Sequence, residues 1–294
     1  MIPLLLVVAL IGSVLWARST YGKIEKVDLS DVLDPVSGDA TNYLLVGSDS
    51  RSEFDPEGES GVEGTRSDTI IILRITPEGA AMMSIPRDLW VEIADTGEMG
   101  RINGAYNRGP ANLVRTVQNN LEVPVNHYME VGFGSFVGLV DAIGGVTINF
   151  PNPVYDPGSG LNVTTAGDVT LDGQQALAYA RARNYTEIID GEEVKEPTAD
   201  LGRQQRQQNF LRTAMQEVGA TRNPVTLVRV ADAMSDELIV DSGLGFTEAL
   251  ALVRKLGSSD PLTVVLPTEG VRRGQAAVLV LDQPEAEQVL AAFR

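Results

Sequence analysis

The sequence of 294 residues contains no cysteine and one histidine, His127. Disulfides, cysteine nucleophiles and zinc-thiolate sites are therefore excluded, and a Ser-His-Asp triad or a histidine-ligated metal is nearly excluded. Positive charge is also scarce, with 23 Lys+Arg against 40 Asp+Glu and a net charge of −17. A nucleic acid repels a surface of this sign, so we expect no nucleic acid partner.

Lysine is rare even among the basic residues, of which 19 are arginine and 4 are lysine. An anionic ligand would need a local positive site on this acidic chain. Arginine suits bidentate binding of phosphate, although a GC-rich genome produces the same bias without any functional meaning.

The first 17 residues (MIPLLLVVALIGSVLWA) carry no charge. At ~1.5 Å per residue they reach ~26 Å as a helix, close to the ~30 Å of a hydrocarbon core. A cut after Ala17 would leave Leu15 at the −3 position, so residues 1–17 are expected to be an uncleaved membrane anchor. Arg18, Lys23 and Lys26 alone would place the body in the cytoplasm, but the abrupt apolar start suggests a basic leader upstream of this start site.

Residues 18–40 are polar and include Pro35 and Gly38, which predicts a stalk. Beyond it, apolar runs and helical spacing alternate without repeats. Strands are predicted at residues 43–46, 69–75, 80–85, 90–93 and 262–266. Helices are predicted at residues 111–121, 135–143, 201–218, 224–234, 247–256 and 284–293. The pattern predicts one α/β domain with a central mixed β-sheet flanked by helices.

Two acidic residues mark a strand end and a strand start. Asp49 lies in GSDSR, directly after the strand 43–46, and Asp68 lies in TRSDTIIIL beside Arg66, just before the strand 69–75. Antiparallel pairing would bring both acids together, and two carboxylates with phosphate oxygens form a hard-oxygen site for Mg²⁺. Turn and capping roles for the two acids are the alternative.

Arginines mark three further segments. Arg87 and Asp88 follow a strand in SIPRDLW, where a simple ion pair is the alternative to a ligand site. Arg181 and Arg183 lie two apart in YARAR, and in an extended segment they would point the same way. On the helix that follows, Asp200, Arg203 and Gln207 form one stripe that continues as Phe210, Leu211, Ala214 and Val218. Burying such polar groups costs free energy unless they bind a ligand or one another, so a ligand site and an internal Asp–Arg network both stay open.

The ordered motifs GSDSR, TRSDTIIIL, SIPRDLW, RINGAY, VGFGSFVGLVDAIGGV, LDGQQALAYARAR and DLGRQQRQQ resemble the LytR-CpsA-Psr family over about residues 41–270. That resemblance implies a membrane-anchored enzyme whose catalytic domain lies outside the cytoplasmic membrane, with residues 271–294 as a tail or short helix. The family transfers glycopolymers from a polyprenyl-pyrophosphate carrier to peptidoglycan with Mg²⁺. For this protein we expect Mn²⁺ to be a possible substitute. The partners expected here are therefore the lipid-linked glycopolymer, a peptidoglycan acceptor and the membrane.

The resemblance also assigns residues. It implies Asp49 and Asp68 as metal ligands. The candidate catalytic residues are Arg87, Asp88 and Asp200, of which Asp88 and Asp200 are alternative candidates for the base. The resemblance implies that pyrophosphate is bound by Arg66, Arg87, Arg101, Arg181, Arg183, Arg203 and Gln207. The acidic insertion at residues 186–199 departs from the family and is expected to be a solvated loop or an acceptor-side lid. His127 is expected to be a surface residue at the start of a strand.

The expected chemistry is attack by a sugar hydroxyl on the glycan-side phosphorus, which forms a phosphodiester and releases polyprenyl phosphate. Two rival classes stay open. A Mg²⁺-dependent pyrophosphatase would use the same site with water, and a membrane-anchored envelope-binding regulator would need no arginine-lined site beside two acids.

Overall fold

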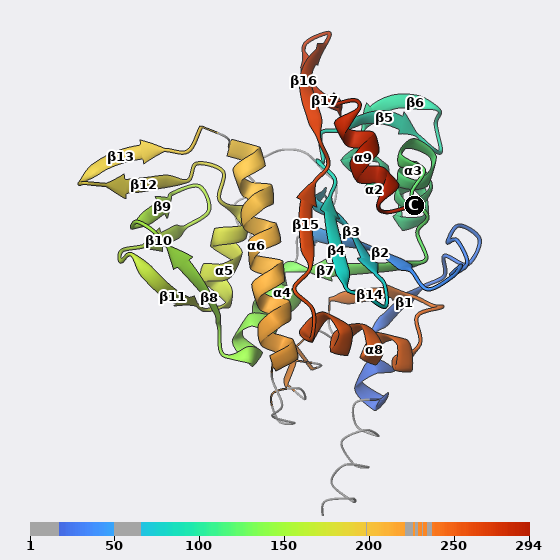
Figure 1. Cartoon of the computed structure of the whole chain (residues 1–294), viewed down its shortest axis with the longest axis horizontal. Helices are drawn as coiled ribbons and strands as arrows, with labels where there is room; N and C mark the ends of the chain where they lie inside the picture. Colours follow the sequence, from blue (N-terminus) through green and yellow to red (C-terminus); the bar gives the residue numbers. More distant parts are fainter. Residues whose placement is uncertain are drawn as a thin grey trace, which may run out of the picture. The chain divides into compact units, whose positions relative to one another are not determined.

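The computed structural model describes residues 18–49, 66–197, 199–220 and 237–294, with a few single positions between 226 and 233 (Figure 1). The predicted anchor at residues 1–17 and much of the predicted helix at 224–234 lie outside the described residues. Two compact units are present, and each is described by itself. The sheet unit comprises Lys26–Phe133, Ile239–Leu244 and Pro261–Arg294, and the α6 unit comprises Met1–Glu25, Gly134–Leu238 and Gly245–Asp260.

The sheet unit is built mainly from strands. Its elements, with β1 and β14 each beginning in the α6 unit, are β1 (Glu25–Val27), β2 (Thr41–Asp49), β3 (Arg66–Ile75), β4 (Ala80–Ser84), β5 (Trp90–Ile93), β6 (Glu98–Arg101), α2 (Asn103–Tyr106), α3 (Pro110–Leu121), β7 (His127–Gly132), β14 (Leu238–Asp241), β15 (Leu262–Val265), β16 (Thr268–Arg273), β17 (Ala276–Leu281) and α9 (Glu285–Ala291).

Its main sheet has seven strands in the order β1-β14-β7-β2-β3-β4-β15. β2 pairs antiparallel with β3 and parallel with β7, and β15 pairs parallel with β4, so the predicted central mixed sheet is confirmed. β1 comes from the stretch expected to be a stalk. The β16–β17 hairpin begins at Thr268, and the segment after residue 270 contributes the rest of it and α9.

The hydrophobic pattern explains the central position of β3. Its residues Ile70, Ile71, Ile72 and Leu73 are all at most 2% exposed, as expected for a strand that is covered on both faces. α2, α3 and α9 contribute to the core that covers the face carrying Ile70 and Ile72.

The α6 unit combines small sheets with longer helices. Its elements are α4 (Phe133–Ile143), β8 (Val146–Phe150), β9 (Val154–Asp156), β10 (Leu161–Val163), β11 (Gly167–Leu171), α5 (Gly173–Arg181), β12 (Thr186–Ile189), β13 (Glu192–Lys195), α6 (Ala199–Ala220) and α8 (Phe246–Gly257). β10, β9, β12 and β13 form one antiparallel sheet, and β8 pairs with β11.

Aromatic contacts fix α5 and α6 within this unit. Phe210 of α6 packs on Phe136 at 4.7 Å between ring centroids, and Tyr179 of α5 meets Phe150 edge to face at 5.6 Å. α5 begins at a capping box. The Asp172 carboxylate accepts a hydrogen bond from the backbone N–H of Gln175, and the side-chain oxygen of Gln175 accepts one from the backbone N–H of Asp172. The capping box therefore fixes the start of the helix that ends at Arg181.

Candidate functional site

The ends of β2 and β3 bring the predicted metal ligands to one end of the main sheet. The strands are antiparallel, with Asp49 opposite Arg66 and Ser48 opposite Ser67. The register shifts between Gly47 and Ser48, since Gly47 pairs with Thr69, so Asp68 falls in the bulge. The antiparallel juxtaposition predicted from the sequence is thus present in the backbone. The side chains of Asp49, Arg66 and Asp68 lie outside the described part of the chain.

A close backbone approach explains the glycine in this motif. A Cβ placed on Gly47 would lie 3.1 Å from the Cβ of Thr69. A side chain there would require Thr69 to shift by a few tenths of an ångström beside the bulge. Gly47 therefore allows the close approach of the two acid-bearing strand ends.

A buried carboxylate lies in the neighbouring strand β7. Glu130 is 5% exposed and accepts hydrogen bonds from the phenols of Tyr106 and Tyr128, the latter at 2.7 Å. The Ser48 hydroxyl also hydrogen-bonds Tyr106, which links this network to the residue before Asp49. Burial and the Glu130 carboxylate raise the pKa of Tyr106 well above its ordinary value. Sequence reasoning missed Glu130, although a glutamate inside the alternating segment HYMEVG is the signal that could have found it.

Arg87, Asp88 and Arg101 form one cluster after β4. The Asp88 carboxylate lies 3.1 Å from Nε of Arg101 and 3.6 Å from Nε of Arg87. Arg101 also donates to the Ala277 carbonyl at 3.0 Å. The ion pair that the sequence left open as the alternative for Arg87 and Asp88 is therefore present. Asp88 holds two of the predicted phosphate-binding arginines.

Arg181 and Arg183 lie at the carboxyl end of α5, in the other unit. Arg181 is the last helical residue and Ala182 leaves the helix with φ −59° and ψ 123°. The expectation of an extended YARAR segment is therefore wrong for its first three residues, because the capping box begins a helix that runs through them. Both arginines are exposed, whereas Ala182 between them is fully buried.

The stripe predicted on α6 faces the core. Arg203 is 2% exposed, Gln207 is half-buried, and Phe210 and Ala214 are buried in the apolar core of this unit. The Gln207 amide donates to the Ala180 carbonyl at 3.2 Å, so it contacts the arginine-bearing segment. The side chain of Asp200 lies outside the described residues. Arg206, which sequence reasoning missed, is also buried and binds the same segment.

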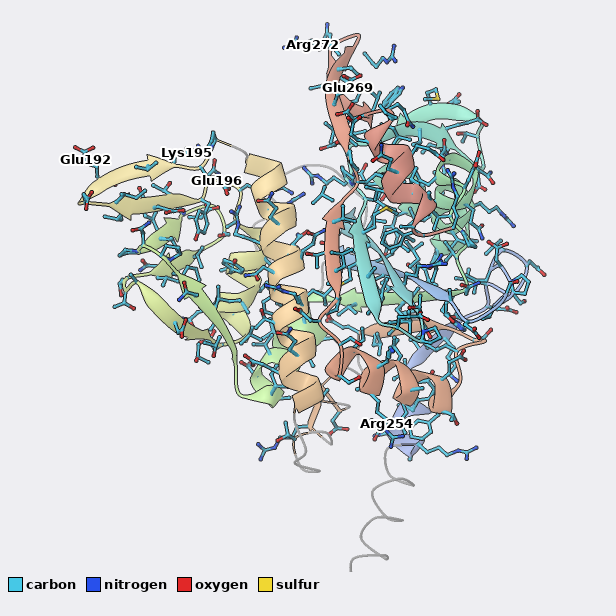
Figure 2. All side chains as sticks on the ribbon, viewed as in Figure 1. Glu192, Lys195, Glu196, Arg254, Glu269 and Arg272 are labelled. Carbon is cyan, nitrogen blue, oxygen red and sulfur yellow. The ribbon has the colours of Figure 1, made fainter. Side chains whose placement is uncertain are left out.

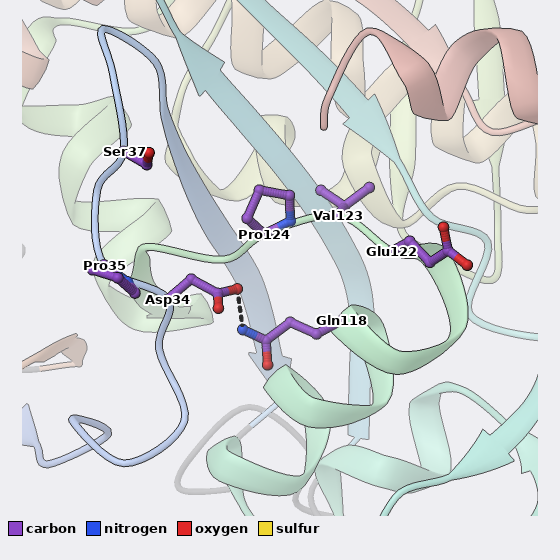
Figure 3. Close-up of a pocket in the computed structure, with 7 residues that line it drawn as sticks. All are labelled: Asp34, Pro35, Ser37, Gln118, Glu122, Val123 and Pro124. Atoms are coloured by element: carbon purple, nitrogen blue, oxygen red, sulfur yellow. Dashed lines mark hydrogen bonds between the residues drawn. The ribbon is translucent and has the colours of Figure 1, made fainter.

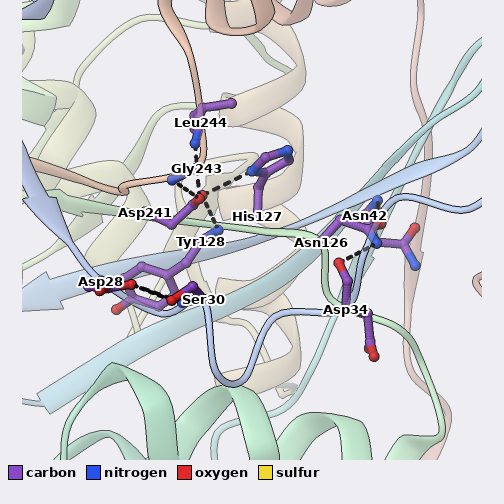
Figure 4. Close-up of polar contacts among 10 residues, drawn as sticks. All are labelled: Asp28, Ser30, Asp34, Asn42, Asn126, His127, Tyr128, Asp241, Gly243 and Leu244. Carbon is purple, nitrogen blue, oxygen red and sulfur yellow. Dashed lines mark hydrogen bonds and ion pairs between the residues drawn. The ribbon is translucent and has the colours of Figure 1, made fainter.

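His127 begins β7, but it is not a surface residue as expected. It is 6% exposed, stacks on Tyr43, and its Nδ1 lies 3.0 Å from Oδ2 of Asp241 (Figure 4). The partner comes from β14, 114 residues further along the chain, which no local pattern reveals.

The acidic insertion forms a hairpin. β12 and β13 pair antiparallel around Asp190 and Gly191, both with positive φ, and all of β13 is exposed (Figure 2). This gives the predicted solvated segment a defined structure.

A shallow pocket of about 420 Å³ lies in the sheet unit (Figure 3). Its lining contains Asp34, Gln118 and Glu122 but none of the predicted site residues. Asp34 accepts a hydrogen bond from Gln118 at 2.7 Å. We assign no role in phosphate binding to this acidic pocket.

Within the described part of the chain, no helix has the length and apolar character needed to cross a membrane. Among the side chains described there, no three histidine, aspartate or glutamate residues gather as a metal cluster.

Comparison with known proteins gives a family match over nearly the whole chain. The model of the LytR_cpsA_psr family matches residues 11–294. The Corynebacterium glutamicum cell wall biosynthesis protein LcpA is 31% identical over 274 residues, which cover 79% of this chain and 51% of that protein. The chain thus spans about half the length of this relative.

A second relative is covered more fully. It is the Enterococcus faecalis polyisoprenyl-teichoic acid--peptidoglycan teichoic acid transferase TagU, 31% identical over 241 residues, or 79% of this chain and 71% of that protein.

Solved structures share the fold. A LytR-Csp2A-Psr enzyme from Actinomyces oris is 26% identical with a TM-score of 0.74, covering 92% of this chain and 95% of that one. The structure of TagT bound to LIIa-WTA, 23% identical with a TM-score of 0.66 over 92% of both chains, has the same fold.

Proposed function

Because the chain belongs to the LytR-CpsA-Psr family, we propose that it is a phosphotransferase that attaches a glycopolymer to peptidoglycan. The donor is a glycopolymer on a polyprenyl-pyrophosphate carrier, and the acceptor is a sugar hydroxyl of peptidoglycan. The TagU relative, whose name describes transfer of teichoic acid from a polyisoprenyl carrier to peptidoglycan, supports this assignment.

The observation that carries the proposal is the register of β2 and β3. It brings the backbones of Asp49, Arg66 and Asp68 to one end of the sheet. Two carboxylates and a guanidinium at one end of the sheet suit a phosphate-bearing substrate with a divalent cation.

A magnesium ion fits the donor chemistry at this sheet end. Asp49 and Asp68 are hard oxygen donors on adjacent strands, and Mg²⁺ usually takes one or two protein carboxylates and completes its shell with water and phosphate oxygens. When bound, the ion would neutralise part of the negative charge of the pyrophosphate. We propose Asp49 and Asp68 as its ligands, with Mn²⁺ as a substitute.

The arginines would bind the pyrophosphate oxygens. Guanidinium groups donate paired hydrogen bonds in one plane and stay positively charged. They can therefore stabilise the negative charge that develops on the departing lipid phosphate. We assign this role to Arg66, Arg87, Arg101, Arg181, Arg183 and Arg203. Gln207 would act through the Ala180 carbonyl that it binds.

In the reaction, the acceptor hydroxyl oxygen bonds to the glycan-side phosphorus, and the bond from that phosphorus to the bridging oxygen breaks. The products are a glycan–peptidoglycan phosphodiester and polyprenyl phosphate, which keeps the bridging oxygen. The hydroxyl proton passes to a base, for which Asp88 and Asp200 are the candidates. A loose transition state needs little help from that base.

We further propose that residues 1–17 anchor the chain in the cytoplasmic membrane and that the body lies outside the cytoplasm. A polyprenyl carrier is confined to the membrane, and peptidoglycan lies beyond it. An anchored external body would meet both substrates.

The test is a reconstituted transfer reaction. The purified chain would be mixed with a polyprenyl-pyrophosphate-linked glycopolymer, Mg²⁺ and peptidoglycan fragments, and polyprenyl phosphate and the glycan–peptidoglycan product would be measured. The proposal predicts that both products form together and require the acceptor. Release of polyprenyl phosphate without acceptor would identify a pyrophosphatase, and absence of both products would favour a non-catalytic regulator.

A further inference from the structure

The segment that carries Arg181 and Arg183 is held in place by charged residues from two other elements. This segment, residues 180–184, comprises the last two residues of α5 and the irregular residues that follow them before β12. The backbone groups of residues 182–184 are therefore outside any helix or strand and need other partners.

Asp156 satisfies the N–H groups on one side. It is the last residue of β9 and is 1% exposed. Its Oδ2 accepts from the backbone N–H of Arg183 at 2.7 Å and from that of Asn184 at 2.8 Å. Its Oδ1 accepts from the N–H of Gly158 at 2.8 Å. One carboxylate thus joins the loop after β9 to the arginine-bearing segment.

Arg206 satisfies a carbonyl on the other side. The residue is 6% exposed, and its guanidinium donates from Nη2 to the Ala182 carbonyl at 2.7 Å. Nη1 donates to Oε2 of Glu196 at 2.8 Å, and the guanidinium carbon lies 4.4 Å from the centre of the Tyr185 ring. Glu196 follows β13 (Figure 2). The guanidinium of Arg206 therefore joins α6 to the segment after α5 and to the residue after β13.

These contacts are made to the backbone of Ala182, Arg183 and Asn184. Asp156 binds the N–H of Arg183 itself, and Arg206 binds the carbonyl of the residue before it. Both side chains are buried, whereas those of Arg181 and Arg183 are exposed. The buried charges therefore fix the backbone and leave the two arginine side chains accessible.

Burying charge is an expensive way to hold a loop, because an apolar contact would avoid the desolvation cost. It gives directional restraint, however, since each hydrogen bond fixes one backbone group. A long arginine side chain loses less freedom on binding an anion when its backbone is already fixed.

We infer that Asp156 and Arg206 are positioning residues that orient Arg181 and Arg183 for the pyrophosphate. The inference rests on the proposed function, because it assigns these residues to the same substrate. They act through the backbone of residues 180–184 and do not touch the substrate.

The first test measures binding of geranyl pyrophosphate by calorimetry in a double-mutant cycle. Asp156→Asn keeps the size of the side chain but removes its charge and turns one acceptor into a donor. We expect the affinity of Asp156→Asn to fall about tenfold, and the same change in an Arg183→Ala background to cost about twofold or less. The matched control is Asp168→Asn, which changes an exposed aspartate of the same unit and should leave affinity unchanged.

A second arm uses Arg206→Lys, which keeps the charge but cannot bind Ala182 and Glu196 together in the fork geometry. We expect a similar loss of affinity that again largely disappears in the Arg183→Ala background. Arg212→Lys, on the more exposed part of the same helix, is the control. All measurements are made at a temperature where thermal melting shows each variant to be fully folded, and the Arg206→Lys arm decides the question if Asp156→Asn does not fold.

The outcomes separate the inference from the proposed function. Equal losses from Asp156→Asn in both backgrounds would mean a general structural role and would overturn the inference. So would unchanged affinity in folded Asp156→Asn and Arg206→Lys, while Arg183→Ala still weakened binding. If Arg183→Ala itself bound geranyl pyrophosphate as tightly as the parent, the assignment of Arg183 in the proposed function would fail, and the positioning role with it.

Discussion

The phenol of Tyr106 donates a hydrogen bond to the carboxylate of Glu130, which joins the short helix α2 to the strand β7. Glu130 is buried and has a second phenol donor in Tyr128. Because Ser48 also bonds to Tyr106, the network stabilises the end of β2 from which Asp49 extends. A buried carboxylate at this place supports the sheet end where the proposed metal ligands lie.

Tyr106→Phe should destabilise the protein by about 1–3 kcal/mol, because the buried Glu130 carboxylate loses one of its donors. Chemical denaturation at pH 7 measures the change. Tyr155→Phe, which alters a tyrosine on the sheet of the β12–β13 hairpin, should change the unfolding free energy by less than about 0.5 kcal/mol. A Tyr106→Phe protein as stable as the parent would show that the bond to Glu130 contributes nothing.

Asp241→Asn should also destabilise the protein, and the effect should depend on pH. Burial acts to raise the pKa of Asp241. Hydrogen bonds from His127 and from the backbone N–H groups of Tyr128 and Gly243 act to lower it and together outweigh burial, so the pKa lies below its ordinary value of 3.8. A lowered pKa means that the carboxylate contributes its stability above about pH 4, and that this contribution is lost as the pH falls through the folded-state pKa.

We therefore expect Asp241→Asn to lower the unfolding free energy by about 3 kcal/mol at pH 7 and by less than that at pH 3. Urea denaturation of both proteins at the two pH values checks this. The same difference at pH 3 and pH 7 would contradict the assigned role of the Asp241 charge.

Much of the sheet could be predicted from the sequence because its strands are strongly apolar. The run IIIL in β3 is buried on both faces. After the turn that follows β3, the strand β4 begins at Ala80, as predicted. β1 was not predicted, since its three residues EKV carry no period-two signal of burial. Its place in the sheet depends on pairing with β14, which is more than two hundred residues away.

The candidate site was predictable where local pattern decides it. The polar-then-apolar stripe of α6 is such a case, because helical spacing alone places Arg203 on the face of Phe210. Asp156 and Arg206 were not found, since their partners are backbone groups of another segment. Every residue type has a backbone carbonyl, so the sequence does not show which one accepts a hydrogen bond.

Arg203→Gln separates a ligand site from a structural ion pair. If Arg203 binds pyrophosphate, we expect unchanged or slightly higher thermal stability, because a cation that serves the ligand adds little stability to the unliganded protein. Transfer should be slower by roughly two to three orders of magnitude. A buried pair with Asp200 would instead cost roughly 3–5 kcal/mol of stability on loss of Arg203. Melting temperature and single-turnover rate are measured together, with the exposed Gln205→Ala on the same helix as control. A large stability loss with activity proportional to folded protein would refute the ligand role.

The absence of cysteine makes the proposed topology directly testable. Glu192→Cys introduces a single thiol on the exposed β13 (Figure 2). A membrane-impermeant maleimide should label it in intact cells as fully as in lysed cells. Labelling only after lysis would place the body in the cytoplasm, and a mature protein that begins near Ser19 by mass spectrometry would exclude the retained anchor.

The metal dependence of transfer in Asp49→Ala and Asp68→Ala tests whether these two acids hold the catalytic metal. Single-turnover formation of the glycan–peptidoglycan product is measured with and without chelator, with Mg²⁺ or Mn²⁺ added back, and with Asp168→Ala as a folded control. We expect chelation to abolish transfer by the parent protein and by the control, and either metal to restore it. Both variants should stay folded and inactive at every metal concentration. Full activity in either variant, or transfer by the parent protein that is indifferent to the chelator, would contradict this role of the two acids.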